Sequence, residues 1–284
     1  MNDGRTKTVQ QMEYIKMKIL SLFDGMSCGQ IALQRLGIEV EKYVASEIDK
    51  YAISVSKKNF PNMIHVGDVR DVKVTEHFDL IMFGSPCQGF SFAGNNLNFD
   101  DPRSKLFFEA VRILEEAKTI NPNVKFLMEN VRMKKESEQV ITDLLGVEPI
   151  AINSSIFSAQ SRYRLYWTNL EVGEIPQDKG IVLKDILEDD YITDRDKSHC
   201  IDANYFKGGN LKSYFEKHRR QLVFSKDGER KLTPLECERL QTVPDNYTNH
   251  VSNTQRYKMI GNGWTIDVIC HLLGSLTYNL GKHC

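Results

Sequence analysis

The sequence contains no arrangement of cysteines that would hold a metal ion. Its 284 residues include 6 cysteines, none of which forms a Cys-x-x-Cys pair or follows the spacing of a zinc site, so we expect no metal. The sequence also lacks a long apolar run and an N-terminal signal-peptide pattern. These absences predict a cytoplasmic protein without a membrane segment, in which a reduced thiol can serve as a nucleophile.

A strong net charge is missing as well. The chain has 37 Lys and Arg against 38 Asp and Glu, a formal net charge of −1, so no global basic field attracts a polyanion. A nucleic acid would have to bind at a local patch. Hydrophobic residues make up 41% of the chain, which is enough to bury a core, and the length suits one large domain with or without a small one.

One short apolar segment, 78–83, leads into a cysteine. The segment is too short for a helix and is followed by Gly84, Pro86 and Cys87, so we expect a buried parallel strand with the thiol just beyond its carboxyl end. In open α/β sheets, ligand-binding and catalytic residues lie at the carboxyl ends of the strands. The pattern fits a nucleophile before a glycine-rich loop, and it fits a buried structural cysteine equally well.

The first part of the chain predicts a Rossmann-like sheet. Residues 18–23 indicate a strand, 24–29 a glycine-bearing turn and 30–36 a helix. Glu47 and Asp68 follow the next two predicted strands, where one carboxylate could accept two ribose hydroxyls and the other an adenine amine. The turn lacks a full Gly-x-Gly-x-x-Gly and a nearby Lys, which favours a nucleoside without phosphates, commonly S-adenosylmethionine. The alternative is a tight turn with two solvated acids.

Two later strands add polar groups. Glu129 follows the predicted strand 124–128, at the strand end next along the chain from the cysteine strand. Arg162 and Arg164 project to one face of a half-buried strand, which is costly unless they meet anions or hydrogen-bond acceptors. The two arginines could bind a polar substrate and a carboxylate. Alternatively, they could be solvent-exposed charges along a surface strand.

A local basic region lies in the second half of the chain. Residues 199–231 carry eight Lys or Arg and four Asp or Glu, a local charge of +4. Lys207, Arg219 and Arg220 are the centre of a possible contact with a phosphate backbone. A solvated charged face is the alternative reading.

Taken together, the motifs resemble those of the DNA (cytosine-5) methyltransferases, in the usual order over nearly the whole chain. The segments that carry the resemblance are 23–25, 86–88, 129–131, 160–164, 230–244 and 261–262. Residues 85–87, 103–109 and Trp264 are similar to the animal de novo branch, and the compact layout is similar to bacterial and phage members.

The resemblance implies an α/β fold, a Rossmann-like S-adenosylmethionine-dependent methyltransferase sheet with a small target-recognition domain. It implies a flexible tail over 1–16, a catalytic, cofactor-binding domain over 17–169 plus 256–284, and a target-recognition domain over 170–255. The implied reaction moves a methyl group from S-adenosyl-L-methionine to C5 of a flipped-out cytosine in duplex DNA and leaves S-adenosyl-L-homocysteine.

Site residues follow from the same resemblance. Cys87 would add to C6 of the base, Glu129 would protonate N3, Arg164 would hold the base carbonyl and Glu129, and Arg162 would brace the nucleophile loop. Expected cofactor-binding residues are Phe23, Gly25, Met26, Ser27, Glu47, Ile48, Asp68, Val69, Pro86, Leu106, Asn262 and Trp264. Expected nucleic-acid-binding residues are Gln88, Ser91, Lys207, Arg219 and Arg220.

Two other functions stay open at this stage. One is a tRNA cytosine-5 methyltransferase on the same scaffold, although the Cys-Phe-Thr tripeptide typical of that branch is absent from the sequence. The other is a catalytically silent DNA-binding regulatory module, although silent relatives lose the cysteine or the glutamate that this chain keeps. The expected partners are double-stranded DNA and possibly a cognate restriction endonuclease, in a bacterial or phage-encoded, nucleoid-associated setting.

Overall fold

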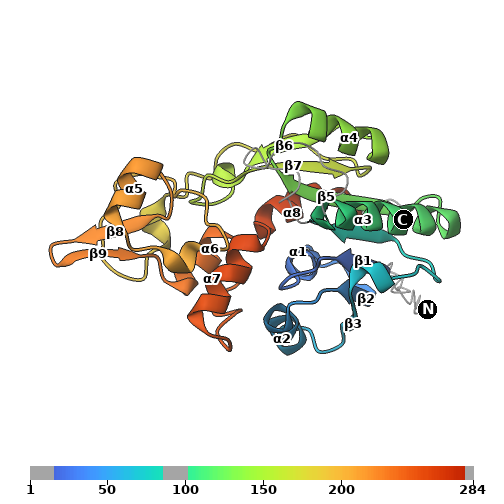
Figure 1. Ribbon diagram of the computed structural model, residues 1–284, viewed down its shortest axis with the longest axis horizontal. Helices are drawn as coiled ribbons and strands as arrows, with labels where there is room; N and C mark the ends of the chain where they lie inside the picture. The colour runs from blue at the N-terminus through green and yellow to red at the C-terminus, as the bar shows by residue number, and fades with distance from the viewer. Residues whose placement is uncertain (1–15, 86–101, 279–284) are drawn as a thin grey trace, which may run out of the picture.

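A seven-stranded sheet forms the centre of the protein in a computed structural model that describes residues 16–85 and 102–278 (Figure 1). Its strands are β1 Met17–Leu22, β2 Val40–Ser46, β3 Ile64–Gly67, β4 Leu80–Phe83, β5 Lys125–Val131, β6 Ile150–Asn153 and β7 Tyr163–Thr168. The strand order is β3-β2-β1-β4-β5-β7-β6, and β7 runs antiparallel to both of its neighbours. The predicted Rossmann-like α/β class is confirmed.

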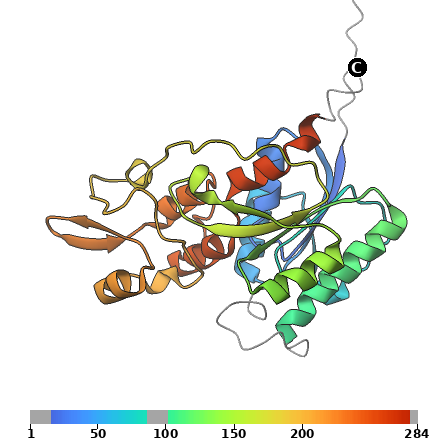
Figure 2. The same ribbon diagram turned by 90° about the horizontal axis from the view of Figure 1, so that it is seen from above.

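Helices cover both faces of this sheet, and others belong to the region beyond it. The helices of the described residues are α1 Cys28–Arg35, α2 Lys50–Asn59, α3 Pro102–Ile120, α4 Lys135–Leu145, α5 Leu211–Lys217, α6 Pro234–Leu240, α7 Asn253–Asn262, α8 Ile266–Leu272 and α9 Ser275–Tyr278. Helices α3 and α4 lie against one face, while α1 and α8 pack together on the other (Figure 2). Strand alternation sends Leu165 and Trp167 to the first face and Tyr166 to the second.

The predicted end of one strand differs from the observed one. Strand β5 continues to Val131 because β7 pairs with it as far as Val131–Arg164, so Glu129 lies within the strand and not after it. Helix α8 ends at Leu272, and the short α9 follows after Gly274.

The region after β7 extends the core of the sheet and then forms a lobe. Leu183, Ile201, Leu232 and Leu240 belong to the same buried cluster as α1 and α8. Farther out, β8 (Leu222–Ser225) and β9 (Gly228–Lys231) form a hairpin next to α5 at one end of the molecule (Figure 1). The expected domain boundary at residue 255 falls within α7, which connects the lobe to the wall of the site described below.

In the described ranges no helix is long and apolar enough to cross a membrane. The expected tail and four expected site residues, Pro86, Cys87, Gln88 and Ser91, lie outside the described residues, apart from Lys16 at the end of the tail.

Candidate active site

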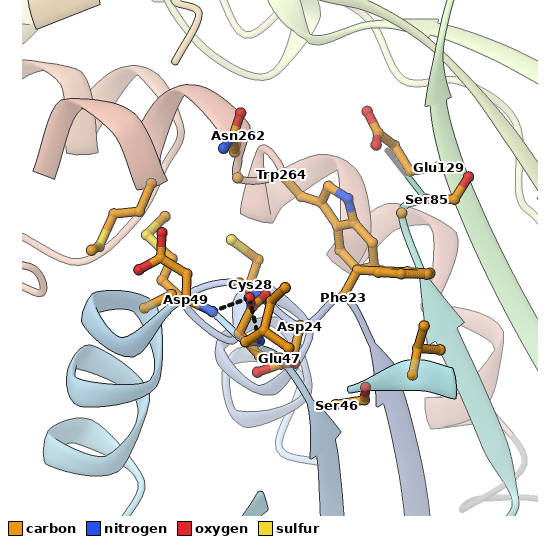
Figure 3. A pocket seen from close by; sticks show the side chains of 18 of the residues that line it. Phe23, Asp24, Cys28, Ser46, Glu47, Asp49, Ser85, Glu129, Asn262 and Trp264 are labelled. Carbon is orange, nitrogen blue, oxygen red and sulfur yellow. Dashed lines mark hydrogen bonds between the residues drawn. The ribbon is translucent and has the colours of Figure 1, made fainter. Parts of the chain in front are cut away.

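A cavity of about 610 Å³ opens at the carboxyl ends of the parallel strands. This volume lies within the usual range for small-molecule sites. Figure 3 shows side chains from the turn after β1, the end of β2, the end of β4, strand β5 and the α7–α8 connection around the same space. Segments far apart in the sequence thus contribute to one wall, as expected for an open α/β sheet.

The turn after β1 has an unusual backbone. Phe23, Gly25 and Ser27 adopt positive φ angles of 53°, 60° and 64°. Such angles are unfavourable for the two non-glycine residues and persist only where the surroundings impose them. Here Asp24 supplies the constraint, because its buried carboxylate accepts hydrogen bonds from the hydroxyls of Ser27 and, at 2.8 Å, Tyr43. Burial raises the pKa of Asp24 to about 6.

Glu47 closes the same turn from the end of β2. Its Oε2 accepts from the backbone N–H of Gly25 at 2.8 Å, and its Oε1 accepts from those of Ile48 and Asp49 at 2.8 and 2.7 Å (Figure 3). A carboxylate offers about four acceptor positions, so three backbone donors fix its orientation and leave acceptor capacity on Oε2. This geometry suits the expected contact with a ribose hydroxyl.

Asp68, after β3, also lies in the wall of the cavity. It accepts two hydrogen bonds at 2.9 Å from Arg70, one from the backbone N–H and one from Nε. These contacts lower the pKa of Asp68 to about 2. The carboxylate is therefore charged and can accept from an amine, although an adenine amine would share it with Arg70, which lines the cavity too.

The remaining expected cofactor residues divide into two groups. Met26, Ile48, Val69, Leu106, Asn262 and Trp264 line the cavity together with Phe23, Gly25, Glu47 and Asp68. Ser27 does not, because it is completely buried and its hydroxyl contacts Asp24 and, at 2.6 Å, the hydroxyl of Ser56. Ile48 is 73% exposed at the cavity, an unusual exposure for an isoleucine and consistent with a surface that a flat ring could cover.

Glu129 and Arg164 form a close pair across β5 and β7. Nε of Arg164 lies 2.9 Å from Oε1 of Glu129, and only 14% and 12% of the two side chains are exposed. The buried Nε–H nevertheless has no hydrogen-bond partner among the residues that the structure describes, so the contact is an ion pair without hydrogen-bond alignment. Burial lowers the pKa of Arg164, but the charge of Glu129, with smaller contributions from Cys200 and Tyr166, together outweighs it, and the net shift is upward.

Gly84 brings the end of β4 against this pair. A Cβ atom added at Gly84 would lie 3.3 Å from Oε2 of Glu129 and 3.0 Å from Nε1 of Trp264. Asn130 connects the same two strand ends, because its amide donates to the hydroxyl of Ser85 at 3.4 Å. The backbone that leads toward position 87 therefore leaves the sheet beside the Glu129 carboxylate.

Arg162 occupies a different environment from Arg164. Its guanidinium is buried and donates to the carbonyls of Ile201, Gly261 and Gly263 at 2.9, 3.1 and 2.9 Å. We expected it to brace the nucleophile loop, which lies outside the described residues. Its described partners instead belong to the lobe and to the α7–α8 connection, so it holds the wall of the cavity in place.

Several residues of the wall were not expected from the sequence. Asp24 stands beside the glycine of the first turn, which could have indicated it. Cys28 lines the cavity as a thiol whose pKa burial raises to about 12. Asp49 and Lys258 both line the cavity and form a salt bridge at 2.8 Å between the start of α2 and α7, for which the sequence holds no signal.

Three of the expected nucleic-acid-binding residues are described by the structure, and they lie in the lobe, outside the lining of the cavity. Lys207 and Arg219 are exposed. Arg220 has a positive φ of 61° and donates to the carbonyl of Lys207 at 3.4 Å, so the fold brings these two segments together. Among the described residues no group of three or more His, Cys, Asp and Glu is arranged to hold a metal ion.

Comparisons with known proteins agree with this architecture. A family model described as C-5 cytosine-specific DNA methylase matches residues 17–166 and 133–277. The chain is 28% identical to the type II methyltransferase M1.ScrFI of Lactococcus lactis subsp. cremoris, over 89% of this chain and 76% of that protein. It is 26% identical to the type II methyltransferase M.HhaI of Haemophilus parahaemolyticus, over 96% and 97%.

A solved structure with a similar fold is that of a Spodoptera frugiperda DNMT2 mutant, with a TM-score of 0.69. The identity is 22%, and the match covers 93% of this chain and 100% of the other. At this identity the likeness supports the fold alone.

Proposed function

The chain belongs to the C-5 cytosine-specific DNA methylase family, and on that premise we propose that it transfers the methyl group of S-adenosylmethionine to C5 of cytosine in duplex DNA. One observation supports this proposal most directly. The ion pair of Glu129 and Arg164 lies in the wall of the same cavity as Glu47, at the strand end that adjoins the chain leading to Cys87.

The cavity at the ends of β1, β2 and β3 is the proposed cofactor site. Glu47 accepts from the ribose, Asp68 accepts from the adenine amine, and the exposed Ile48 covers the ring. When bound there, S-adenosylmethionine supplies an electrophilic methyl group. The Asp24 network keeps the turn in its strained conformation, so its backbone is already shaped before the cofactor binds.

Cys87 is the proposed nucleophile. C5 of cytosine is a poor nucleophile because the ring is electron-poor, and addition of a thiolate at C6 converts C5 into an enamine carbon. Cys87 is two positions after Ser85, which lines the cavity, and an extended chain spans at most about 7 Å over that distance. Chain length therefore permits the sulfur to meet a base held beside Glu129.

Glu129 and Arg164 are the proposed electrostatic partners of the base. Glu129 gives a proton to N3 as the Cys87–C6 bond forms, which removes the charge that thiolate addition creates. Arg164 donates to the base carbonyl from its guanidinium, whose Nε–H has no hydrogen-bond partner among the described residues. After methylation, water takes the C5 proton, Glu129 recovers its proton from N3, and the C6–S bond breaks to release the Cys87 thiolate.

The base must leave the duplex to reach this cavity, so base flipping is part of the proposal. The exposed Lys207 and Arg219 are placed in the lobe to contact the phosphate backbone, together with Arg220. We assign target recognition to this lobe, in the region 170–255. We also place the enzyme in the cytoplasm with the nucleoid, where a partner endonuclease would act on the same sites.

Methyl transfer from labelled cofactor to duplex DNA and to tRNA tests the proposal directly. We expect incorporation into DNA, loss of activity in Cys87→Ala, and a covalent complex with a 5-fluorocytosine duplex in the wild type alone. Incorporation into tRNA without DNA would support the alternative RNA substrate. Cofactor-independent DNA binding without any transfer would support the silent module.

A further inference from the structure

A basic segment follows the proposed catalytic glutamate and has no role in the account above. Arg132, Lys134 and Lys135 come directly after β5, and all three are exposed. Met133 between them is 3% exposed and packs into the core beneath α3 and α4, which anchors the segment. The two flanking side chains, Arg132 and Lys134, therefore point away from the core at the edge of the sheet where the cavity opens.

The charge of this segment is incompletely neutralised. Lys135 pairs with Glu138 at 2.6 Å, while no carboxylate of the described residues lies within ion-pair distance of Arg132 or Lys134. The guanidinium of Arg132 instead lies over the ring of Tyr163, at 5.8 Å from its centre. An aromatic ring holds the side chain by its face and leaves the N–H donors available to an anion.

The position of Arg132 suits a phosphate near the reacting nucleotide. Glu129 and Val131 line the cavity, and Arg132 stands three residues beyond Glu129, about 10 Å along an extended strand. A base seated beside Glu129 carries its phosphates one sugar away, on the side from which it entered. Strands β5 and β7, which carry Arg132 and Tyr163 near their ends, are adjacent in the sheet (Figure 1).

We propose that Arg132, supported by Tyr163, and Lys134 form a second DNA-backbone contact on the catalytic domain, which holds the phosphates beside the flipped nucleotide. This proposal rests on the DNA substrate proposed above. In this arrangement the lobe and the segment 132–134 contact the same DNA molecule, one on each side of the cavity. Because phosphate contacts carry no sequence information, the segment adds affinity and positioning without adding specificity.

The test is DNA binding and methylation by an Arg132→Glu/Lys134→Glu variant, measured over a range of salt concentrations. Each lost phosphate contact lowers the slope of log affinity against log salt by about 0.9, so we expect a slope reduced by nearly 2. The KM for DNA should rise about tenfold or more at low salt. The rate at saturating DNA, the affinity for S-adenosylhomocysteine and the 5-fluorocytosine adduct should stay unchanged.

A Lys57→Glu/Lys58→Glu variant provides a control with the same change in net charge. Both lysines are exposed in the last turn of α2. This end of the helix lies away from the carboxyl ends of the strands, whereas its first turn lines the cavity. This control should keep the wild-type slope of log affinity against log salt concentration. The conservative Arg132→Lys variant keeps the positive charge and should therefore keep most of the DNA affinity that the double Glu variant loses. An unchanged slope in the first variant, or an equal change in the control, overturns the proposal. A wild type that does not methylate DNA overturns the proposed function instead.

Discussion

Arg164 and Glu129 lie in ion contact at 2.9 Å without a hydrogen bond between them. The two side chains come from adjacent antiparallel strands, where Val131 is paired with Arg164 and Glu129 with Tyr166. Both are largely buried, so their mutual attraction is weakly screened. The pair is thus held by charge. Nη1 and Nη2 of Arg164 donate to the carbonyl of Tyr163 at 2.8 Å and to Sγ of Cys200 at 3.9 Å, so the Nε–H and the Glu129 carboxylate are the groups left for a third partner, which we propose is the target base.

Replacing Glu129 by Gln should abolish most of the activity and leave cofactor binding intact. The amide cannot deliver a proton to N3, and general acid catalysis of this kind contributes about 100- to 10,000-fold. We expect the rate of methyl transfer to fall by that factor, measured at saturating DNA, while the affinity for S-adenosylhomocysteine stays within about twofold. Full activity in the Glu129→Gln variant would show that Glu129 does not take part in proton transfer.

Replacing Arg162 by Met should destabilise the fold. The carbonyls of Ile201, Gly261 and Gly263 would lose their donor, and each unsatisfied buried group costs about 1–3 kcal/mol. We expect the free energy of unfolding in urea to fall by roughly 3 kcal/mol or more. Full stability combined with lost methyl transfer would assign Arg162 to the reaction and not to the wall.

Replacing Gly84 by Ala should reduce activity more than stability. The added methyl group would lie 3.0 Å from Trp264 Nε1 and 3.3 Å from Glu129 Oε2, so one of these side chains must move. We expect methyl transfer to fall about tenfold or more, since small displacements of reacting groups are costly. Gly173→Ala is the matched control, because nothing lies within 4 Å of its added Cβ. Equal activity in both variants would contradict the crowding argument.

Asp24 should make stability depend on pH. Its pKa is raised from 3.8 to about 6 by burial, so the folded state keeps a proton that the unfolded state releases in this range. Stability should therefore fall as pH rises from about 3 to about 7, through the unfolded and folded pKa values, by about 3 kcal/mol in total. Asn at position 24 does not titrate, so the unfolding free energies of wild type and Asp24→Asn should diverge across this interval. Parallel pH profiles would show that Asp24 is not shifted.

Local signals in the sequence were sufficient for most of the scaffold. Thr233 and Pro234 are residue types that favour the start of a helix, and α6 begins at Pro234, with the Thr233 hydroxyl accepting from the backbone N–H of Glu236 at 3.1 Å. The apolar run before Gly84 forms the buried strand β4, and Glu47 follows β2 as expected. These features depend on near neighbours in the chain, on turn chemistry and on the alternation of side chains along a strand.

Contacts between distant segments could not be predicted in this way. The carbonyl partners of Arg162 are 39 to 101 residues away, and the bridge from Asp49 to Lys258 joins positions 209 residues apart. The fully buried Glu238 meets Arg256 at 3.1 Å, although its surrounding sequence is typical of a surface helix. Each of these contacts depends on which helices, strands and loops pack together. The pattern of neighbouring residues along the chain does not specify this packing.

The amino-acid sequence by itself determined the class of sheet, the positions of Glu47 and Asp68 after β2 and β3, and the family whose motifs the chain follows. The tertiary structure alone decided that Arg162 donates to the carbonyls of Ile201, Gly261 and Gly263, that Ser27 is buried behind the turn and does not line the cavity, and that Arg132 lies over Tyr163. The physical reason is that residue types and their spacing set local conformation, whereas burial, charge pairing and hydrogen-bond partners arise only when distant segments pack.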